Sequence, residues 1–158
     1  ETGLEIIIIR PPLIYGPGVK GNFHQLIKII QRGLPLPLAS IKNSRSFIGL
    51  RNCVDVIIKA STAPKISTNL FLVSDDHNIS TPELIRRLAN AMGIKASLFP
   101  LPVYMLTSGA QLLGKAHVIQ RLTSSLEIDV NETKDCLDWV PPFDIDSELI
   151  RLTNNMGA

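Results

Sequence analysis

The sequence predicts an α/β fold with a parallel sheet. The segment Ile6–Ile9 is continuously apolar and β-branched, without polar alternation, which is typical of a strand buried on both faces. Further short apolar segments then alternate along the chain with segments of helical periodicity. A doubly covered strand needs neighbours on both sides, and the chain supplies none before Ile6–Ile9. We therefore expect a part of the fold to lie upstream of this sequence.

Length and composition limit the possible classes of function. The chain has 158 residues, of which 45% are hydrophobic and 19% charged, as in a folded domain with its own core. A net charge of +2 with scattered basic residues argues against a nucleic-acid partner. No apolar stretch approaches the roughly 20 residues of a membrane span, and no signal peptide is visible. Cys53 and Cys136 are predicted to be free thiols in the cytoplasm.

Proline and glycine divide the first part of the chain. Arg10-Pro11-Pro12 should end the first strand because proline cannot donate to the ladder, and residues 15–18 form a loop. Asn22 is the expected N-cap of a helix that runs to about Arg32, with Gly33 as its stop. The apolar residues of this helix share one face, namely Phe23, Leu26, Ile27 and Ile30.

The middle of the chain is predicted to hold two more strands and two helices. Residues 34–38 are extended by their prolines, and residues 45–50 and 69–73 are the expected strands. The helix between these strands covers residues 52–61, with an inward face of Val54, Ile57 and Ile58. The next helix begins after Ser80, its cap, and runs to about Met92; Glu83 lies three residues after the cap and Pro82 falls in the first turn.

The last third is predicted to be mostly helical. A strand is expected at residues 96–99, and residues 127–130 are ambiguous. The predicted helices cover residues 103–113, 131–137 and 146–155.

A glycine-rich segment, Gly16–Gly21, matches the dinucleotide pattern G-x-G-x-x-G letter for letter. That fingerprint requires a glycine directly after a strand and an acidic residue about 20 positions later. Here five residues, two of them proline, separate the strand from Gly16, and residues 36–41 contain no Asp or Glu. The segment is therefore interpreted as a loop.

Other candidate groups have simpler interpretations. The histidines, at positions 24, 77 and 117, lack the spacing of a metal site, and no metal ligand is predicted. Ser74-Asp75-Asp76 is interpreted as a strand-end turn that uses aspartate for local hydrogen bonds. Arg45 is either a surface arginine, which its local sequence favours, or a bidentate phosphate clamp.

Five motifs occur in an order that resembles the extended short-chain dehydrogenases, the family of nucleoside-diphosphate-sugar 4-epimerases and 4,6-dehydratases. The first two are a strand and loop similar to RP-x-x-x-YGPG at residues 10–18, and a segment similar to R-S-[FL]-[VI]-x-V-x-[DN]-L-V-D at residues 45–55. The others are a strand at residues 69–74, a Ser-Thr-Pro-Glu-Leu helix start at residues 80–84, and a closing element similar to LGW-x-P at residues 137–142. The likeness covers essentially the whole chain.

The resemblance implies that residues 1–158 are the carboxy-terminal, substrate-binding part of such an enzyme. They would hold a late strand of a Rossmann-type parallel sheet and the small α/β substrate-binding domain, without the amino-terminal NAD-binding part. The family's catalytic Tyr-x-x-x-Lys is absent, since Tyr15 is followed at the fourth position by Val19 and Tyr104 by Ser108. We therefore predict no catalytic residue in this chain and no activity of the chain alone.

The resemblance also implies a set of binding residues. The nicotinamide end of NAD would lie against Pro11, Pro12 and Leu13. The phosphates and base of the sugar nucleotide would meet Asn22 and Phe23 at a helix N-terminus, a favourable place for anions. The uracil pocket would be lined by Pro37, Leu38 and Ala39. The diphosphate would be held by Arg45 and, less directly matched, by Arg121. Position 13 departs from the family, where many members have Asn instead of Leu.

The function implied is epimerisation at C4 of a UDP-hexose by hydride transfer to and from NAD, in surface polysaccharide biosynthesis. The complete enzyme would be a cytoplasmic homodimer. Two alternatives remain open at this point: a 4,6-dehydratase or reductase of the same family, and a non-catalytic module that binds sugar nucleotides.

Overall fold

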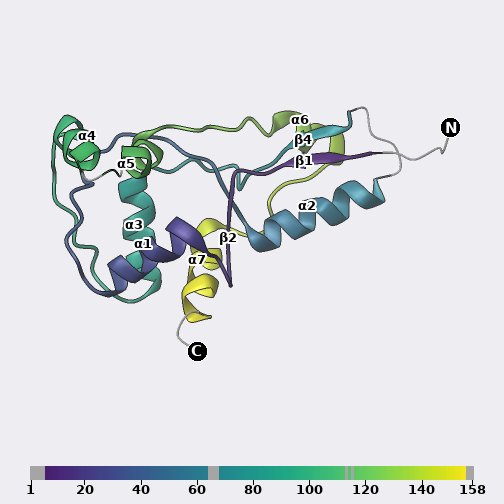
Figure 1. The fold of residues 1–158 in the computed structure, drawn as a ribbon. Helices are drawn as coiled ribbons and strands as arrows, with labels where there is room; N and C mark the ends of the chain where they lie inside the picture. Colours follow the sequence, from purple (N-terminus) through teal and green to yellow (C-terminus); the bar gives the residue numbers. More distant parts are fainter. Residues whose placement is uncertain (1–5, 64–67, 113, 115, 156–158) are drawn as a thin grey trace.

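A computed structural model describes residues 6–63, 68–112, 114 and 116–155 of the chain (Figure 1). The described strands are β1 (Ile8–Arg10), β2 (Leu13–Tyr15), β3 (Phe47–Gly49) and β4 (Leu70–Leu72). The described helices are α1 (Gly21–Gln31), α2 (Leu50–Thr62), α3 (Thr81–Ala91), α4 (Val103–Leu112), α5 (Ala116–Thr123), α6 (Asn131–Leu137) and α7 (Ile145–Asn154). The predicted α/β class is confirmed.

The four strands form two separate parallel pairs. β1 pairs with β4, with Ile9 opposite Phe71, and β2 pairs with β3, with Ile14 opposite Ile48. Each pair is joined by a crossover that contains at least one helix, as parallel strands require. β1 ends at Arg10–Pro12, as predicted. The chain then forms a further strand, β2, which was not predicted. The last residue of β2, Tyr15, belongs to the segment 15–18 that was predicted to be a loop.

β1 is covered on one face only by the described residues. Ile7 and Ile9 pack against the core, whereas Ile6 is 63% and Ile8 43% exposed. The prediction of a strand buried on both faces is therefore wrong for the chain as described. The periodicity of the sequence shows which residues can be buried, but burial itself depends on which elements are present to cover them.

Two hydrophobic clusters form the core. One joins α1, α3 and α7 around residues such as Ile27, Leu88 and Leu149, and it also takes in Tyr15 from the end of β2. The other joins α2, β4 and the segment after α6, with Val56, Phe71 and Trp139 at its centre. Figure 1 shows α1 and α3 to the left of β2 and α7 at its lower left, whereas α2 and α6 lie beside the β1–β4 pair.

The inward face of α2 differs from the predicted one. Val54, Ile57 and Ile58 are 47%, 47% and 57% exposed, so the expectation that they face inward is wrong. The buried residues of this helix are instead Asn52, Cys53, Val56 and Ala60. Both sets have helical spacing, and the polar Asn52 is buried because it has partners that only the tertiary structure provides.

Several helix ends agree with the sequence, and others shift. Ser80 Oγ accepts a hydrogen bond from the backbone N–H of Glu83 at 3.3 Å, which confirms the predicted cap. The cap of α1 is Lys20, so Asn22 lies inside the helix instead of capping it. The cap of α7 is Asp144, whose side chain accepts from the backbone N–H of Ser147, instead of Asp146. Helix α5 was not predicted.

The expected strand at residues 96–99 is reduced to a single bridge between Leu36 and Leu98. The backbone N–H of Leu36 donates to Ser97 at 2.8 Å and that of Phe99 donates to Leu36 at 3.1 Å. This pairing places the proline-rich segment before Ile41 beside residues 97–99. The predicted end of the fourth helix at residue 113 lies outside the described residues.

Candidate functional site

The carboxyl ends of β2 and β3 lie side by side, with Tyr15 opposite Gly49. In open α/β folds, ligands bind at this end of the strands. The loop after β2 begins with a turn in which the N–H of Val19 donates to Gly16 at 3.1 Å. A Cβ at position 16 would lie 2.7 Å from the Cβ of Leu50, so glycine lets this loop pass close to the start of α2.

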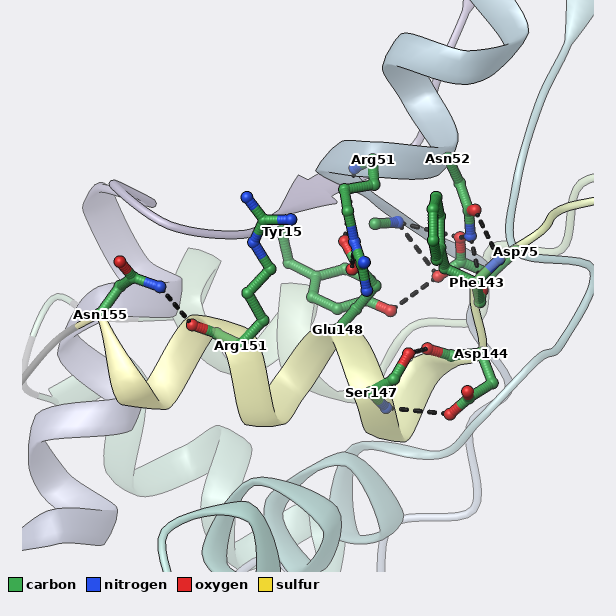
Figure 2. A network of polar contacts seen from close by, with 11 residues as sticks. Tyr15, Arg51, Asn52, Asp75, Phe143, Asp144, Ser147, Glu148, Arg151 and Asn155 are labelled. Atoms are coloured by element: carbon green, nitrogen blue, oxygen red, sulfur yellow. Dashed lines mark hydrogen bonds and ion pairs between the residues drawn. The ribbon is translucent and has the colours of Figure 1, made fainter.

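Asp75 is the centre of a polar network at this edge (Figure 2). Tyr15 Oη donates to its Oδ2 at 2.7 Å, the backbone N–H of Gly49 donates to its Oδ1 at 2.9 Å, and Asn52 Nδ2 donates to its Oδ1 at 2.7 Å. Burial raises the pKa of Asp75, while its hydrogen bonds act in the opposite direction. The carboxylate thereby joins β2, β3 and α2 through partners that lie 60, 26 and 23 residues from it in sequence.

Glu148 is a second buried carboxylate at the same helix start, and only 1% of its surface is exposed. It accepts hydrogen bonds from the backbone N–H of Arg51 at 3.3 Å and from the guanidinium of the same residue. The Arg51 guanidinium carbon also lies 3.7 Å from the centre of the Phe143 ring, a cation–π contact. Since the N-cap of α2 is Gly49, which has no side chain, Asp75 and Glu148 satisfy amides that the helix cannot cap itself.

Asn52 completes this network from inside α2. Its Nδ2 donates to the carbonyl of Phe143 at 2.8 Å, and its Oδ1 accepts from the N–H of Phe143 at 3.0 Å. The side chain is fully buried. The two bonds to one backbone residue attach the segment before α7 to the start of α2 (Figure 2).

Tyr15 connects the network to α1. Its ring stacks on that of Phe23, with a centroid distance of 6.2 Å and an interplanar angle of 28°. Burial and the neighbouring Asp75 raise the pKa of Tyr15 above its ordinary value, so the phenol keeps its proton and acts as a hydrogen-bond donor. Tyr15 therefore serves as a buried hydrogen-bond donor to Asp75.

The structure brings Arg45 and Arg121 together. The Arg45 guanidinium donates to the backbone carbonyl of Arg121 in α5, and the backbone of Arg45 bridges Ile79 and Leu126. Partial burial lowers the pKa of Arg45. The resemblance placed both arginines in one phosphate site; this stays a prediction, because the bond reaches the main chain of Arg121 and not its guanidinium.

The other predicted ligand residues differ in accessibility. Pro11 and Leu13 are exposed beside the end of β1, and Pro12 is half-buried. Asn22 is exposed in the first turn of α1, but Phe23 is only 5% exposed, so little of Phe23 is open to a ligand. In the segment predicted to line the uracil pocket, Leu38 is buried in the core, whereas Pro37 and Ala39 are half-buried.

Sequence reasoning missed the Asp75 and Glu148 network. The interpretation of Ser74-Asp75-Asp76 as a turn in which aspartate makes the local hydrogen bonds is wrong. The partners of the Asp75 carboxylate are remote, the Asp76 carboxylate pairs with Lys134, and the local bond runs from the N–H of Asp76 to Ser74 Oγ. Glu148 was not singled out because it stands among the ordinary charges of an amphipathic helix. Its burial was not visible in the local sequence.

A recess of about 280 Å³ lies elsewhere, at the carboxyl ends of α1, α3 and α7. Its lining includes Gln31, Met92 and Thr153 and contains none of the predicted ligand residues. Across residues 6–63, 68–112, 114 and 116–155, no cluster of His, Cys, Asp or Glu could hold a metal ion. Within those ranges no helix is long and apolar enough to cross a bilayer.

We compared the chain with known proteins, and its relatives are of the kind that the sequence motifs resemble. No family model matches the chain. A curated UDP-glucose 4-epimerase of Vibrio cholerae is 41% identical over 143 residues, covering 90% of this chain and 44% of the relative. The structure of a UDP-N-acetylglucosamine 4-epimerase from Bacillus cereus matches the whole chain with a TM-score of 0.73 at 19% identity. The structure of a UDP-glucuronic acid 4-epimerase from the same organism, in complex with NAD, matches 98% of it at 0.72 and 18%.

The parallel strand pairs and their helices define the class: the fold is α/β and matches the carboxy-terminal part of Rossmann-type dehydrogenase/reductase structures. The chain spans about half the length of the relatives that it matches. It is similar to sugar-nucleotide epimerases and dehydratases of the extended short-chain dehydrogenase/reductase family, as its motifs predict.

Proposed function

We propose that this chain is the sugar-nucleotide-binding part of an NAD-dependent UDP-hexose 4-epimerase. The observation that carries the proposal is the 41% identity to a UDP-glucose 4-epimerase over nine-tenths of the chain. The partly exposed Arg45 supports it, because a guanidinium group suits a phosphate. The alternatives of a 4,6-dehydratase, a reductase or a non-catalytic binding module have no comparable sequence support.

The role proposed for this part is positioning of the substrate. Arg45 and Arg121 would hold the diphosphate, Asn22 would approach it at the start of α1, and residues 37–39 would receive the uracil. Contacts to the nucleotide, remote from the reacting carbon, would set the hexose at a fixed distance from the cofactor. The exposed apolar surface of Pro11 and Leu13 fits one side of a nicotinamide ring but offers no charged group for the cofactor's phosphates.

NAD, when bound, would take a hydride from C4 of the sugar and return it to the other face. Residues 1–158 hold no Tyr-x-x-x-Lys, so the proton at the C4 hydroxyl would be removed by a group outside them. We propose that an NAD-binding half completes the enzyme. Homodimer formation, a cytoplasmic location and a place in surface polysaccharide synthesis belong to the same proposal.

Calorimetric titration of the purified chain with UDP tests the binding role. Arg45→Ala should weaken binding by about 1.5–3 kcal/mol if a charged hydrogen bond to phosphate is lost. Arg86→Ala, which removes an exposed arginine of α3, is the matched control and should leave the affinity unchanged. Absence of UDP binding by the unaltered chain would contradict the proposed function, and equal affinities of the two variants would contradict the role of Arg45.

Turnover gives a separate test. The chain incubated with UDP-glucose and NAD should give no UDP-galactose, since it lacks the family's catalytic pair. Conversion above the rate of a sample without protein would show that the missing pair is not needed and would overturn this part of the proposal.

A further inference from the structure

Asp75 joins the two arms of the chain that lead to the predicted phosphate ligands. One arm starts at Tyr15, which donates to Asp75 at 2.7 Å, and continues through the glycine loop to Asn22. The other arm runs from Arg45 through β3 to Gly49, whose N–H donates to Asp75 at 2.9 Å. The arm that carries Asn22 and the arm that carries Arg45 are thus held together by one carboxylate.

Tyr15 has features that suit a fixed anchor. Its side chain is 1% exposed, its ring is stacked on Phe23 of α1, and burial keeps its hydroxyl protonated. The residue directly after it is Gly16, where the loop passes against Leu50 too closely for a side chain. A loop held at Tyr15 and pressed against α2 has little freedom to vary its path.

We propose that Tyr15 and Asp75 are positioning residues that pre-organise the phosphate-binding arms. The pair fixes the glycine loop and the start of α1 against the carboxyl end of β3, so that the segments carrying Asn22 and Arg45 keep a fixed relation to each other. This inference rests on the proposed function for the identity of the ligand. Neither residue contacts the ligand in this proposal, so both act through the groups that they hold.

Tyr15→Phe tests the pair with the least change in shape, since it removes one hydroxyl and keeps the stacked ring. The control is Tyr104→Phe, which removes the same hydroxyl from the other tyrosine, 69% exposed on α4. Both variants are titrated with UDP and with uridine, which lacks phosphates, and the dissociation constants are read from NMR shifts. Tyr15→Phe should raise the constant for UDP about 3- to 10-fold, the effect of one hydrogen bond, and leave that for uridine unchanged.

If the Tyr15 hydroxyl only stabilised the fold, Tyr15→Phe would lower thermal stability. At a temperature where the variant is folded, its dissociation constants for UDP and uridine would then not differ in their response. Unchanged UDP affinity, or an equal loss for UDP and uridine, would overturn the proposal.

Hydrogen exchange supplies a measurement that needs no ligand. The amide of Val19, which donates to Gly16 in the loop turn, should exchange faster in Tyr15→Phe, while the amide of Leu88 in the core of α3 should not change. Unchanged exchange at Val19 would overturn the proposal. If the unaltered chain binds no UDP but this loop responds, the proposed function fails and the anchoring by Tyr15 and Asp75 stands.

Discussion

The carboxylate of Glu148 lies against the backbone of Gly49, 99 residues earlier in the chain. A Cβ added to Gly49 would lie 2.7 Å from Cγ and 2.9 Å from Oε2 of Glu148. Position 49 is therefore glycine because of a close approach and not because of its backbone angle, which is extended at φ −65° and ψ 145°. This contact allows α7 to cap α2 and sets how close the two helices come.

Gly49→Ala should consequently destabilise the protein. The added methyl forces Glu148 or the start of α2 to move, and overpacking of this kind costs about 1–3 kcal/mol. Urea denaturation measures the loss. Gly109→Ala in α4 is the matched control, because a Cβ there meets nothing within 4 Å and alanine should stabilise the helix by about 0.5–1 kcal/mol. A loss of the same size at both positions would contradict the close approach.

The two partners of the buried ion pair should respond unequally to substitution. Arg51→Ala leaves the carboxylate of Glu148 buried without its cation and removes the contact with Phe143, so we expect a loss of about 1–3 kcal/mol. Glu148→Gln keeps the shape and an acceptor for the N–H of Arg51, while the guanidinium, whose side chain is 31% exposed, can turn to solvent. Its loss should be about 1 kcal/mol or less. Equal losses in urea denaturation would show that desolvation of the carboxylate is not the dominant effect.

Stability should depend on pH through the cap of α7. Asp144 accepts a hydrogen bond from the N–H of Ser147 at 2.9 Å, and this bond lowers the pKa of Asp144. The folded state then favours the charged form, so the cap's contribution is present above the unfolded-state pKa, about 3.9 for Asp, and is lost as pH falls through the folded value. Asp144→Ala should cost about 1 kcal/mol at pH 7.

The measurement is urea denaturation of Asp144→Ala and the unaltered chain at several pH values. The difference between them should shrink below about pH 4. Asp135→Ala, an exposed aspartate of α6, serves as the control. A difference that stays constant down to the lowest pH would mean that the charge of Asp144 plays no part in the cap.

The buried face of α2 can be tested with two neighbouring residues. Val56→Ala removes fully buried apolar volume and should cost about 1.5–3 kcal/mol. Ile57→Ala alters a side chain that is 47% exposed and should stay within about 0.5 kcal/mol of the unaltered chain. A larger loss of stability for Ile57→Ala than for Val56→Ala would support the inward face of α2 that the sequence pattern predicted.

Only part of the predicted ligand site could be derived from the sequence. Motif order identified the family, and the local pattern left Arg45 with two possible roles. Helical spacing placed Phe23 on the apolar face of its helix, and that face is buried. The pattern could not show that Leu38 turns into the core, because the buried side of an extended segment depends on the elements packed against it. The proximity of Arg45 to Arg121 likewise depends on α5, which the local pattern did not reveal.

Local signals in the sequence were enough to predict some of the elements. The cap at Ser80, the stop at Gly33, the strand break at Pro11 and the span of α6 all follow from backbone chemistry within a few residues. Tertiary structure alone decided the burial of Asp75 and Glu148, the exposed face of α2 and the single covered face of β1. The physical reason is that a capped amide or a fixed dihedral needs only near neighbours, whereas burial is set by groups that the chain brings together from far apart.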